Sequence, residues 1–238
     1  MSEQTQTIIE GLLEKLTIQI DPCQLMTEEQ IQALQKAEKE RRRVELSQRR
    51  LEAFCAPKRL ILGRSHLNRA TLWGEKLNKL KPQIGTGTLL VFQGPSGTGK
   101  TQMAIELAYY AMTEKDLSAK FTTLSEFQLE LKSTFGKDGG EQAVVQRMIR
   151  PDLLVIDEFD WAPMKKERVT DDYWQGILYH IINHRYGDMK DTLLTSNKSA
   201  EEFEQTTLVP LKSRIMETGG IISTEGWRDW RTQKEQKQ

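Results

Sequence analysis

The stretch of sequence that decides the fold is Gly94-Pro95-Ser96-Gly97-Thr98-Gly99-Lys100-Thr101. Its outer glycines, its lysine and its final hydroxyl residue have the spacing of a phosphate-binding loop. The glycines let the backbone curl so that successive N–H groups face one anion, and a helix that starts at the lysine points its positive end at that anion. The apolar run 89–92 predicts a strand before the loop, and residues 100–112 predict a helix after it. Together they predict an α/β nucleotide-binding fold.

The residues of this loop have separate expected roles. Lys100 is expected to reach the β- and γ-phosphates of ATP, and the hydroxyl of Thr101 is expected to bind Mg²⁺. The predicted cofactors are therefore ATP and Mg²⁺. We assign nucleotide binding to the whole loop and the residue after it: Gly94, Pro95, Ser96, Gly97, Thr98, Gly99, Lys100, Thr101 and Gln102.

Two acidic residues, Asp157 and Glu158, follow the apolar run 153–156. The run predicts a buried strand, and the carboxyl ends of parallel strands line the ligand crevice of an α/β fold. We expect Asp157 to hold the magnesium, directly or through water. Glu158 is placed to polarise a water molecule for attack on the γ-phosphate.

Polar residues also close the next predicted strand, 192–195, where Asn197 follows Thr195 and Ser196. A polar side chain at this strand end can contact the γ-phosphate or the attacking water. The alternative is a helix cap or turn before Ser199, a common use of serine and asparagine.

Two arginines near the C-terminal end, Arg214 and Arg231, are further candidates. By themselves they are ordinary surface arginines, but an arginine that reaches a γ-phosphate stabilises transition-state charge strongly. His180 and His184 lie four residues apart on a predicted helix. We disfavour a metal site there, because Ile181 replaces the glutamate of the HExxH motif and no third ligand is evident.

Apolar runs alternate with helical patterns after about residue 68. Further strands are predicted at 120–123, 153–156 and 192–195, and helices at 141–149 and 172–186. Ser125 and Gln128 have the spacing of a capping box, which predicts another helix start. This alternation predicts a parallel sheet with helices on both faces.

The N-terminal part has a different, helical character. Apolar residues at 8–16 have helical spacing, and the capping-box pattern at 27–30 predicts a helix from 28 to the low 50s. Pro57 is expected to end it, and residues 56–65 have the composition of a linker. We predict a helical partner-binding segment, a linker, an ATPase domain and a flexible tail, at 1–60, 61–69, 70–231 and 232–238 respectively.

Positive charge is concentrated between Lys36 and Arg64, which hold ten Lys/Arg and four Glu in a chain of formal net charge +0. One interpretation is a solvated helical face. The other is an arm that docks on a partner or on nucleic acid.

The composition sets wider limits. In 238 residues, 37% are hydrophobic and 29% charged, so a core can form beneath a strongly polar surface. Cys23 and Cys55 form no CxxC pair, which argues against a zinc ribbon. There is no signal-peptide pattern and no apolar run near the roughly 20 residues that span a bilayer. We expect a cytoplasmic protein without a membrane partner.

Taken together, the motifs resemble those of the AAA+ ATPases, and within them the DnaC-type helicase loaders and the related IstB-type transposition ATPases. The resemblance covers roughly residues 70–231. It rests on 94–101, Thr123–Phe127 with 131–135, Leu153–Glu158, 182–186, 193–197, Ser213-Arg214-Ile215 and Trp227-Arg228-Asp229-Trp230-Arg231. It implies a P-loop NTPase fold of the AAA+ type: a parallel sheet flanked by helices, a small helical N-terminal segment and no separate lid domain.

The resemblance also implies roles for single residues. Asn197 matches the sensor-1 residue, and Arg231 matches the sensor-2 arginine that contacts its own subunit's nucleotide. Arg214 matches the arginine finger that acts on the neighbouring subunit's ATP. ATP would then lie between subunits that associate head to tail, an arrangement that builds rings or spirals.

The function that this implies is an ATP-dependent helicase loader for replication initiation. It would bind single-stranded DNA and, through residues 1–60, a hexameric replicative helicase. The alternative is a transposition ATPase that binds duplex DNA and recruits a transposase. A small-molecule kinase is disfavoured, because we find no motif for an acceptor pocket or a basic lid.

Overall fold

The computed structural model describes residues 28–66, 71–160, 169–207 and 209–230. The chain divides into two compact units, Met1–Glu45 and Leu46–Gln238. The described part of the first unit belongs to helix α2 (Glu28–Ala53), which confirms the helix predicted from residue 28. The predicted helix at 8–16, Thr27 of the capping box and the tail at 232–238 lie outside the described residues.

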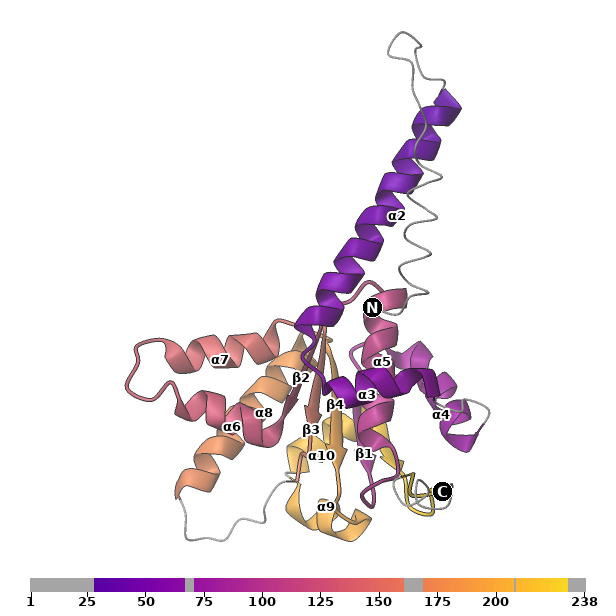
Figure 1. Cartoon of the computed structure of the whole chain (residues 1–238). Coiled ribbons are helices and arrows are strands. Elements are labelled where there is room, and N and C mark those ends of the chain that lie inside the picture. Colours follow the sequence, from indigo (N-terminus) through magenta and orange to yellow (C-terminus); the bar gives the residue numbers. More distant parts are fainter. Residues whose placement is uncertain (1–27, 67–70, 161–168, 208, 231–238) are drawn as a thin grey trace. The chain divides into compact units, whose positions relative to one another are not determined.

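A five-stranded parallel sheet forms the centre of the second unit, which confirms the predicted fold class (Figure 1). The strand order is β2-β3-β4-β1-β5. β1 lies between β4 and β5, with Leu90 opposite Leu193 on one side and Gly220 on the other. The bounds are β1 (Leu89–Gln93), β2 (Ala119–Thr123), β3 (Leu153–Asp157), β4 (Asp191–Ser196) and β5 (Gly220–Ser223).

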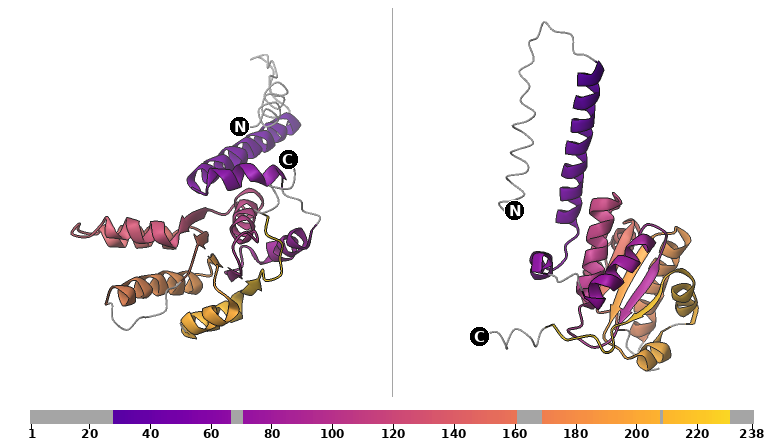
Figure 2. Two further views of the ribbon diagram at one scale, coloured as in Figure 1. Left: turned by 60° about the horizontal axis from the view of Figure 1, so that its bottom comes forward. Right: turned by 90° about the vertical axis from the view of Figure 1, so that its right-hand side faces the viewer.

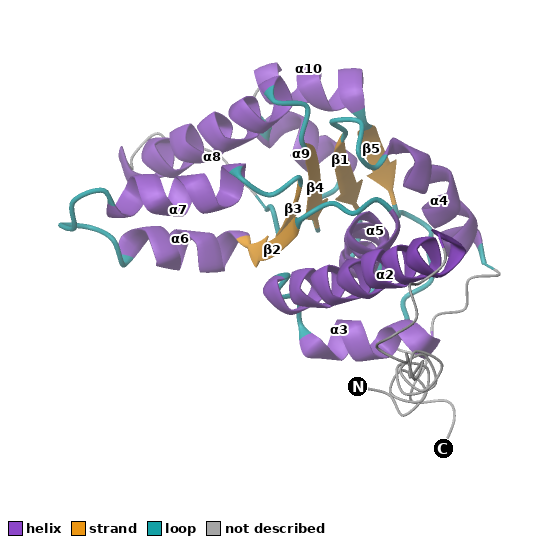
Figure 3. Cartoon of the chain, turned by 90° about the horizontal axis from the view of Figure 1, so that it is seen from above, coloured by secondary structure: helices purple, strands orange, loops and turns teal. Residues whose placement is uncertain are grey.

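Helices cover both faces of this sheet, as Figure 3 shows with α5 on one side and α8 and α10 on the other. Two further views show the strands between these layers (Figure 2). The first face carries α3 (Lys58–Leu62), α4 (Leu72–Leu80) and α5 (Lys100–Glu114), with short 3-10 helices at Gly63–His66 and Lys81–Gln83. The second carries α6 (Leu124–Lys132), α7 (Gly140–Ile149), α8 (Val169–Gly187), α9 (Ala200–Thr206) and α10 (Val209–Thr218).

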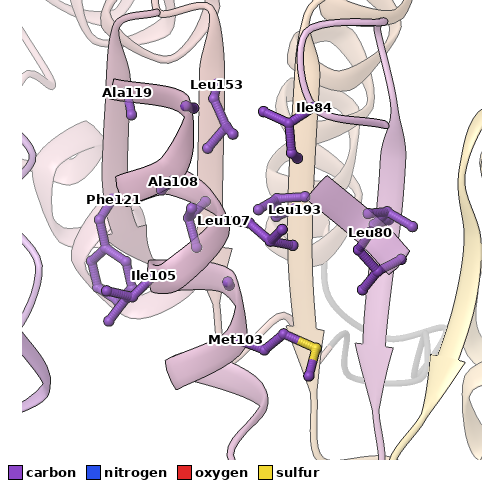
Figure 4. Packing of buried hydrophobic residues seen from close by; sticks show 14 of the residues in the cluster. Leu80, Ile84, Met103, Ile105, Leu107, Ala108, Ala119, Phe121, Leu153 and Leu193 are labelled. Carbon is purple, nitrogen blue, oxygen red and sulfur yellow. The ribbon is translucent and has the colours of Figure 1, made fainter. Parts of the chain in front are cut away.

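Alternation along the strands builds two hydrophobic cores. In β1, Leu90 and Phe92 join the core beneath α5, while Leu89 and Val91 join the core beneath α8 and α10. Successive side chains of a strand point to opposite faces, so a fully apolar strand serves both cores. Figure 4 shows residues of the first core, where Leu107 of α5 and Leu193 of β4 lie near one another.

One predicted helix start is wrong. Ser125 does not cap α6; Thr123 does, since its side chain accepts a hydrogen bond from Glu126 N while the Glu126 carboxylate accepts one from Thr123 N. The capping box therefore begins at the last residue of β2, two positions before the prediction. This leaves no loop between β2 and α6.

The predicted linker at 56–65 is also structured differently. It contains α3, and the preceding Phe54 and Ala56 are buried in the core beneath α5. The backbone N–H of Phe121 in β2 donates to Phe54 O at 3.1 Å. The unit that contains the sheet thus begins at Leu46, before the predicted boundary at 61–69.

A buried arginine joins α8 to the amino ends of β3 and β4. The Arg185 guanidinium is fully buried and donates to the carbonyls of Met148, Ile149, Pro151, Asp152 and Asp191 and to Thr192 Oγ1. Burial lowers the pKa of Arg185 to about 10, against the opposing effect of Asp191 and Asp152. The guanidinium therefore stays charged at neutral pH, and its hydrogen bonds link the amino ends of β3 and β4. No helix in the described ranges is both long and apolar enough to cross a membrane.

Candidate functional site

The carboxyl ends of β3 and β4 and the loop after β1 enclose a cavity of about 520 Å³. Parallel strands bring their carboxyl ends to one edge, which is where α/β folds bind ligands. The cavity is lined by Pro57, Arg59, Leu60, Trp73, Ser96, Gly97, Gly99, Lys100, Thr101, Gln102, Asp157, Glu158, Thr195, Asn197 and Trp230. The structure thus brings most of the predicted site residues together, although they come from three separate segments.

The loop from Gly94 to Thr101 holds its lysine by its own backbone. Lys100 Nζ donates to the carbonyls of Gly94 and Pro95, at 2.7 Å each. Gly99 has φ +88° directly before α5, a conformation that favours glycine. Gly94, Pro95 and Thr98 are not among the lining residues, so these three predicted nucleotide-binding residues lie outside the cavity wall.

The two predicted magnesium ligands are in contact. Thr101 Oγ1 donates to Asp157 Oδ1 at 2.8 Å. The hydroxyl of Thr195 in β4 donates to the same carboxylate oxygen. The sequence identified Thr195 only as part of a polar strand end, and the pairing of β3 with β4 makes it a partner of Asp157.

Glu158 has an unusual backbone conformation for a residue other than glycine, with φ +55°. Its N–H donates to Thr195 Oγ1 at 3.1 Å, and its exposed side chain lines the cavity. Residues held in this region carry strain of about 1–3 kcal/mol and occur often at functional sites. β3 thus ends directly before Glu158, the residue predicted to act as the base.

Asp160, which the sequence analysis did not single out, positions Asn197. Its Oδ1 accepts bonds from Ser196 Oγ and Asn197 N, both at 2.8 Å, and its Oδ2 accepts one from Asn197 Nδ2 at 3.2 Å. These bonds tie the end of β4 to the segment after β3. An acid two residues after Glu158 has no local signal for this role, because its partners are 36 and 37 residues away.

The segment after β5 forms hydrogen bonds with the phosphate loop. Thr224 Oγ1 lies 2.7 Å from Thr98 Oγ1, and Trp230 N donates to Gly97 O at 3.1 Å. The Asp229 carboxylate lies so close to Gly97 that an ideal Cβ there would be 2.1 Å from Asp229 Oδ1. A side chain at position 97 would therefore require the Asp229 carboxylate to move, and the φ of +85° there also favours glycine.

Residues from before β1 form another wall of the cavity. Pro57, Arg59 and Leu60 come from the start of α3, and the Trp73 indole N–H donates to Gly99 O at 3.3 Å. Gln102 Nε2 donates to Leu60 O at 3.3 Å, which anchors α3 to α5. Sequence patterns did not assign Pro57, Arg59, Leu60 or Trp73 to the site. The first three lie in the segment 56–65, which has the composition of a linker.

Arg214 is not among the residues that line the cavity of its own subunit. It lies on α10 against α8, where its Nη1 donates to Tyr179 Oη at 3.0 Å. Arg231 lies outside the described residues. The rings of His180 and His184 are 6.1 Å apart, and His184 Nδ1 lies 3.3 Å from Asp188 Oδ2.

Residues 12–214 match the sequence pattern of the IstB-like ATP binding protein family. This chain belongs to that family. A relative in Bacteroides fragilis, an IS21-like insertion-sequence ATP-binding protein, is 29% identical over 49% of this chain and 41% of its own length. The IS232 ATP-binding protein of Bacillus thuringiensis subsp. berliner is 25% identical over 58% and 53% respectively. The chain thus spans about half the length of these relatives or less.

Solved structures show the same fold at low identity. The DnaI structure has a TM-score of 0.54 at 16% identity, covering 72% of this chain and 93% of DnaI. The DnaC helicase loader has a TM-score of 0.53 at 19% identity, covering 66% and 93%. AMPPCP-bound DnaA from Aquifex aeolicus has a TM-score of 0.52 at 20% identity, covering 63% and 44%. These likenesses agree with the parallel sheet and its helical layers.

The geometry of this IstB-like site fits a nucleoside triphosphate. A volume of about 520 Å³ lies within the usual range for small-ligand sites. The glycine loop and the start of α5 supply an anion-binding end, and Trp73, Leu60 and Trp230 supply apolar walls. A hydroxyl and a carboxylate in contact, Thr101 and Asp157, are oxygen ligands of the kind that magnesium prefers.

Proposed function

We propose that this chain is a magnesium-dependent ATPase that uses ATP binding and hydrolysis to switch between assembled and released states. The observation that carries the proposal is the convergence of Lys100, Thr101, Asp157 and Glu158 on one cavity. A pocket built only for binding needs no acid beside the metal ligands, whereas hydrolysis needs a group that polarises water.

Each residue has a role in this proposal. Lys100 and the loop N–H groups bind the β- and γ-phosphates, and Thr101 and Asp157 hold Mg²⁺, which neutralises phosphate charge when bound. Glu158 accepts a proton from the attacking water, and Asn197, oriented by Asp160, positions that water. Arg231 contacts the nucleotide of its own subunit.

Arg214 acts on the ATP of a neighbouring copy in a head-to-tail assembly. Arg214 does not line the cavity of its own subunit, which supports a role at the site of another subunit. The test is ATP turnover by Arg214→Ala as protein concentration rises to saturation. We expect turnover to stay at least about tenfold below the unmodified chain. Full activity at saturation would exclude the role in trans.

Transposition is the setting that the sequence relatives favour, because the family and its curated relatives are ATP-binding proteins of insertion sequences. In this setting the chain binds duplex DNA and recruits a transposase.

Helicase loading is the second candidate, supported by the motif combination that ends in Ser213-Arg214-Ile215 and Trp227–Arg231 and by the likeness to the DnaC loader. The chain would then bind single-stranded DNA and, through residues 1–60, a hexameric replicative helicase. Capture assays with ATP, using a transposase of an IS21-like element and a replicative helicase in parallel, separate the two. Retention of only one of them identifies the setting.

Helix α2 supplies a candidate contact with DNA, since Arg41, Arg42 and Arg43 are exposed. Two other arginines of the basic stretch form ion pairs within the chain, Arg50 with Asp116 and Arg64 with Glu106. If α2 binds phosphates, reversing the charges at 41–43 lowers DNA affinity and flattens its dependence on salt. Unchanged DNA affinity would favour the other interpretation, that these arginines form a solvated helical face.

A further inference from the structure

Two tyrosines of α8 flank Arg214. The guanidinium carbon lies 5.3 Å from the ring centre of Tyr179 and 5.2 Å from that of Tyr186. These tyrosines are seven residues apart, two helical turns, so their rings lie on one face of α8. Arg214 reaches this face from α10, which packs beside α8 (Figure 3).

The hydrogen bonds of this cluster leave part of the guanidinium unused. Arg214 Nη1 donates to Tyr179 Oη at 3.0 Å and to Pro210 O at 3.2 Å. Within the described residues, Nε and Nη2 have no acceptor, and no carboxylate lies within 4.0 Å of the guanidinium. Tyr186 Oη donates instead to Glu217 at 2.8 Å, which fixes its ring. The arginine is therefore held by aromatic rings rather than neutralised by an acid.

This arrangement differs from an ordinary surface arginine. A cation over an aromatic ring is attracted without losing its charge, and two rings restrict a side chain that otherwise samples many rotamers. A guanidinium retains planar N–H donors suited to phosphate. An ion pair with an acid would have cancelled the charge that a phosphate needs.

We propose that Tyr179 and Tyr186 are positioning residues that hold Arg214 ready to contact the triphosphate of a second copy of this chain. This inference rests on the proposed function, since it requires Arg214 to act in trans. It deepens that function by naming the residues that orient the arginine before assembly. Ordering Arg214 beforehand reduces the entropy lost when it meets the transition state.

The test uses two full-length proteins that complement each other. Arg214→Ala has an intact phosphate loop but no arginine to offer, and Lys100→Ala offers Arg214 but cannot use its own loop. Neither alone is expected to turn over ATP well, and the mixture restores turnover at the Arg214→Ala sites. The donor is then changed to Lys100→Ala with Tyr186→Leu or Tyr179→Leu, and titrated to saturation.

We expect each leucine donor to lower the restored kcat about fivefold, with KM for ATP unchanged because ATP binds in the other protein. A donor with Tyr186→Phe keeps the ring and is expected to restore more activity than one with Tyr186→Leu. The matched control is a donor with Tyr173→Phe, since Tyr173 also lies on α8 but bonds to Glu141. Thermal melts of every donor identify variants that fail to fold.

The outcomes separate the two proposals. If the simple Lys100→Ala donor restores nothing, the action of Arg214 in trans is wrong. If it restores turnover and both folded leucine donors restore it equally well, Arg214 acts in trans and the positioning role of the tyrosines is wrong.

Discussion

Thr101 Oγ1 donates a 2.8 Å hydrogen bond to Asp157 Oδ1 and so joins the first turn of α5 to the last residue of β3. The two residues are 56 positions apart in the sequence. They meet because β3 and β4 are paired and β4 pairs with β1, the strand that leads into the loop. This contact places a hydroxyl and a carboxylate within reach of a single cation.

Asp157→Asn is expected to remove the dependence of ATP binding on magnesium. The amide keeps the shape of the carboxylate but loses the charge that attracts the cation. Titration of a fluorescent ATP analogue with Mg²⁺ or with EDTA measures this. We expect EDTA to weaken binding at least about tenfold in the unmodified chain and to have little effect on the variant. Equal sensitivity of the two proteins would place the cation elsewhere.

Glu158→Gln is expected to bind ATP normally and lose turnover by about a hundredfold or more, because the amide cannot accept the proton of water. Glu158→Gly is expected to lose turnover too, yet to raise the unfolding free energy by about 1 kcal/mol, because glycine relieves the φ of +55°. Steady-state ATPase assays and urea denaturation measure the two effects. A glycine variant that is less stable than the unmodified chain would contradict the inferred backbone strain at Glu158.

Gly97→Ala is expected to weaken ATP binding severely. Its Cβ would lie 2.1 Å from Asp229 Oδ1, and the backbone there has φ +85°. Adding Asp229→Ala removes the overlap but not the backbone strain, so affinity is expected to recover only in part. Calorimetric titration of ATP into the single and double variants measures this, with Gly136→Ala as control, because Gly136 also has positive φ but open space around it. Equal losses at positions 97 and 136 would show that Asp229 has no part in the effect.

Arg185→Lys is expected to lower the unfolding free energy by about 3 kcal/mol, because lysine has too few donors for the six oxygen atoms that Arg185 bonds. Guanidinium chloride denaturation measures this. Arg147→Lys is the control: Arg147 is exposed and pairs with Glu130, so its change should stay within about 0.5 kcal/mol. If Arg185→Lys lowers the unfolding free energy no more than the control does, the hydrogen bonds of Arg185 contribute little to stability.

Much of the sheet could be predicted from sequence because its strands are short apolar runs and its helices carry local signals. The start of α6 was misplaced because Thr123 with Glu126 and Ser125 with Gln128 both have capping-box spacing, and packing of β2 selects the first. β5 was not predicted, since its four residues include only two apolar ones and are too few to be distinguished from a loop. Likewise, α3 and α4 lie in a segment whose charged composition obscures the residues that face the core.

The sequence by itself determined the phosphate loop, the two acids at the carboxyl end of β3 and the α/β alternation, because these depend on backbone conformation and periodicity over a few residues. Only the tertiary structure decided that Thr195 shares the carboxylate of Asp157, that Asp160 orients Asn197, and that α3 with Trp73 forms a wall of the cavity. It also decided that Arg214 rests on Tyr179 and Tyr186. These contacts depend on strand register and helix packing, which bring together residues that no local pattern connects.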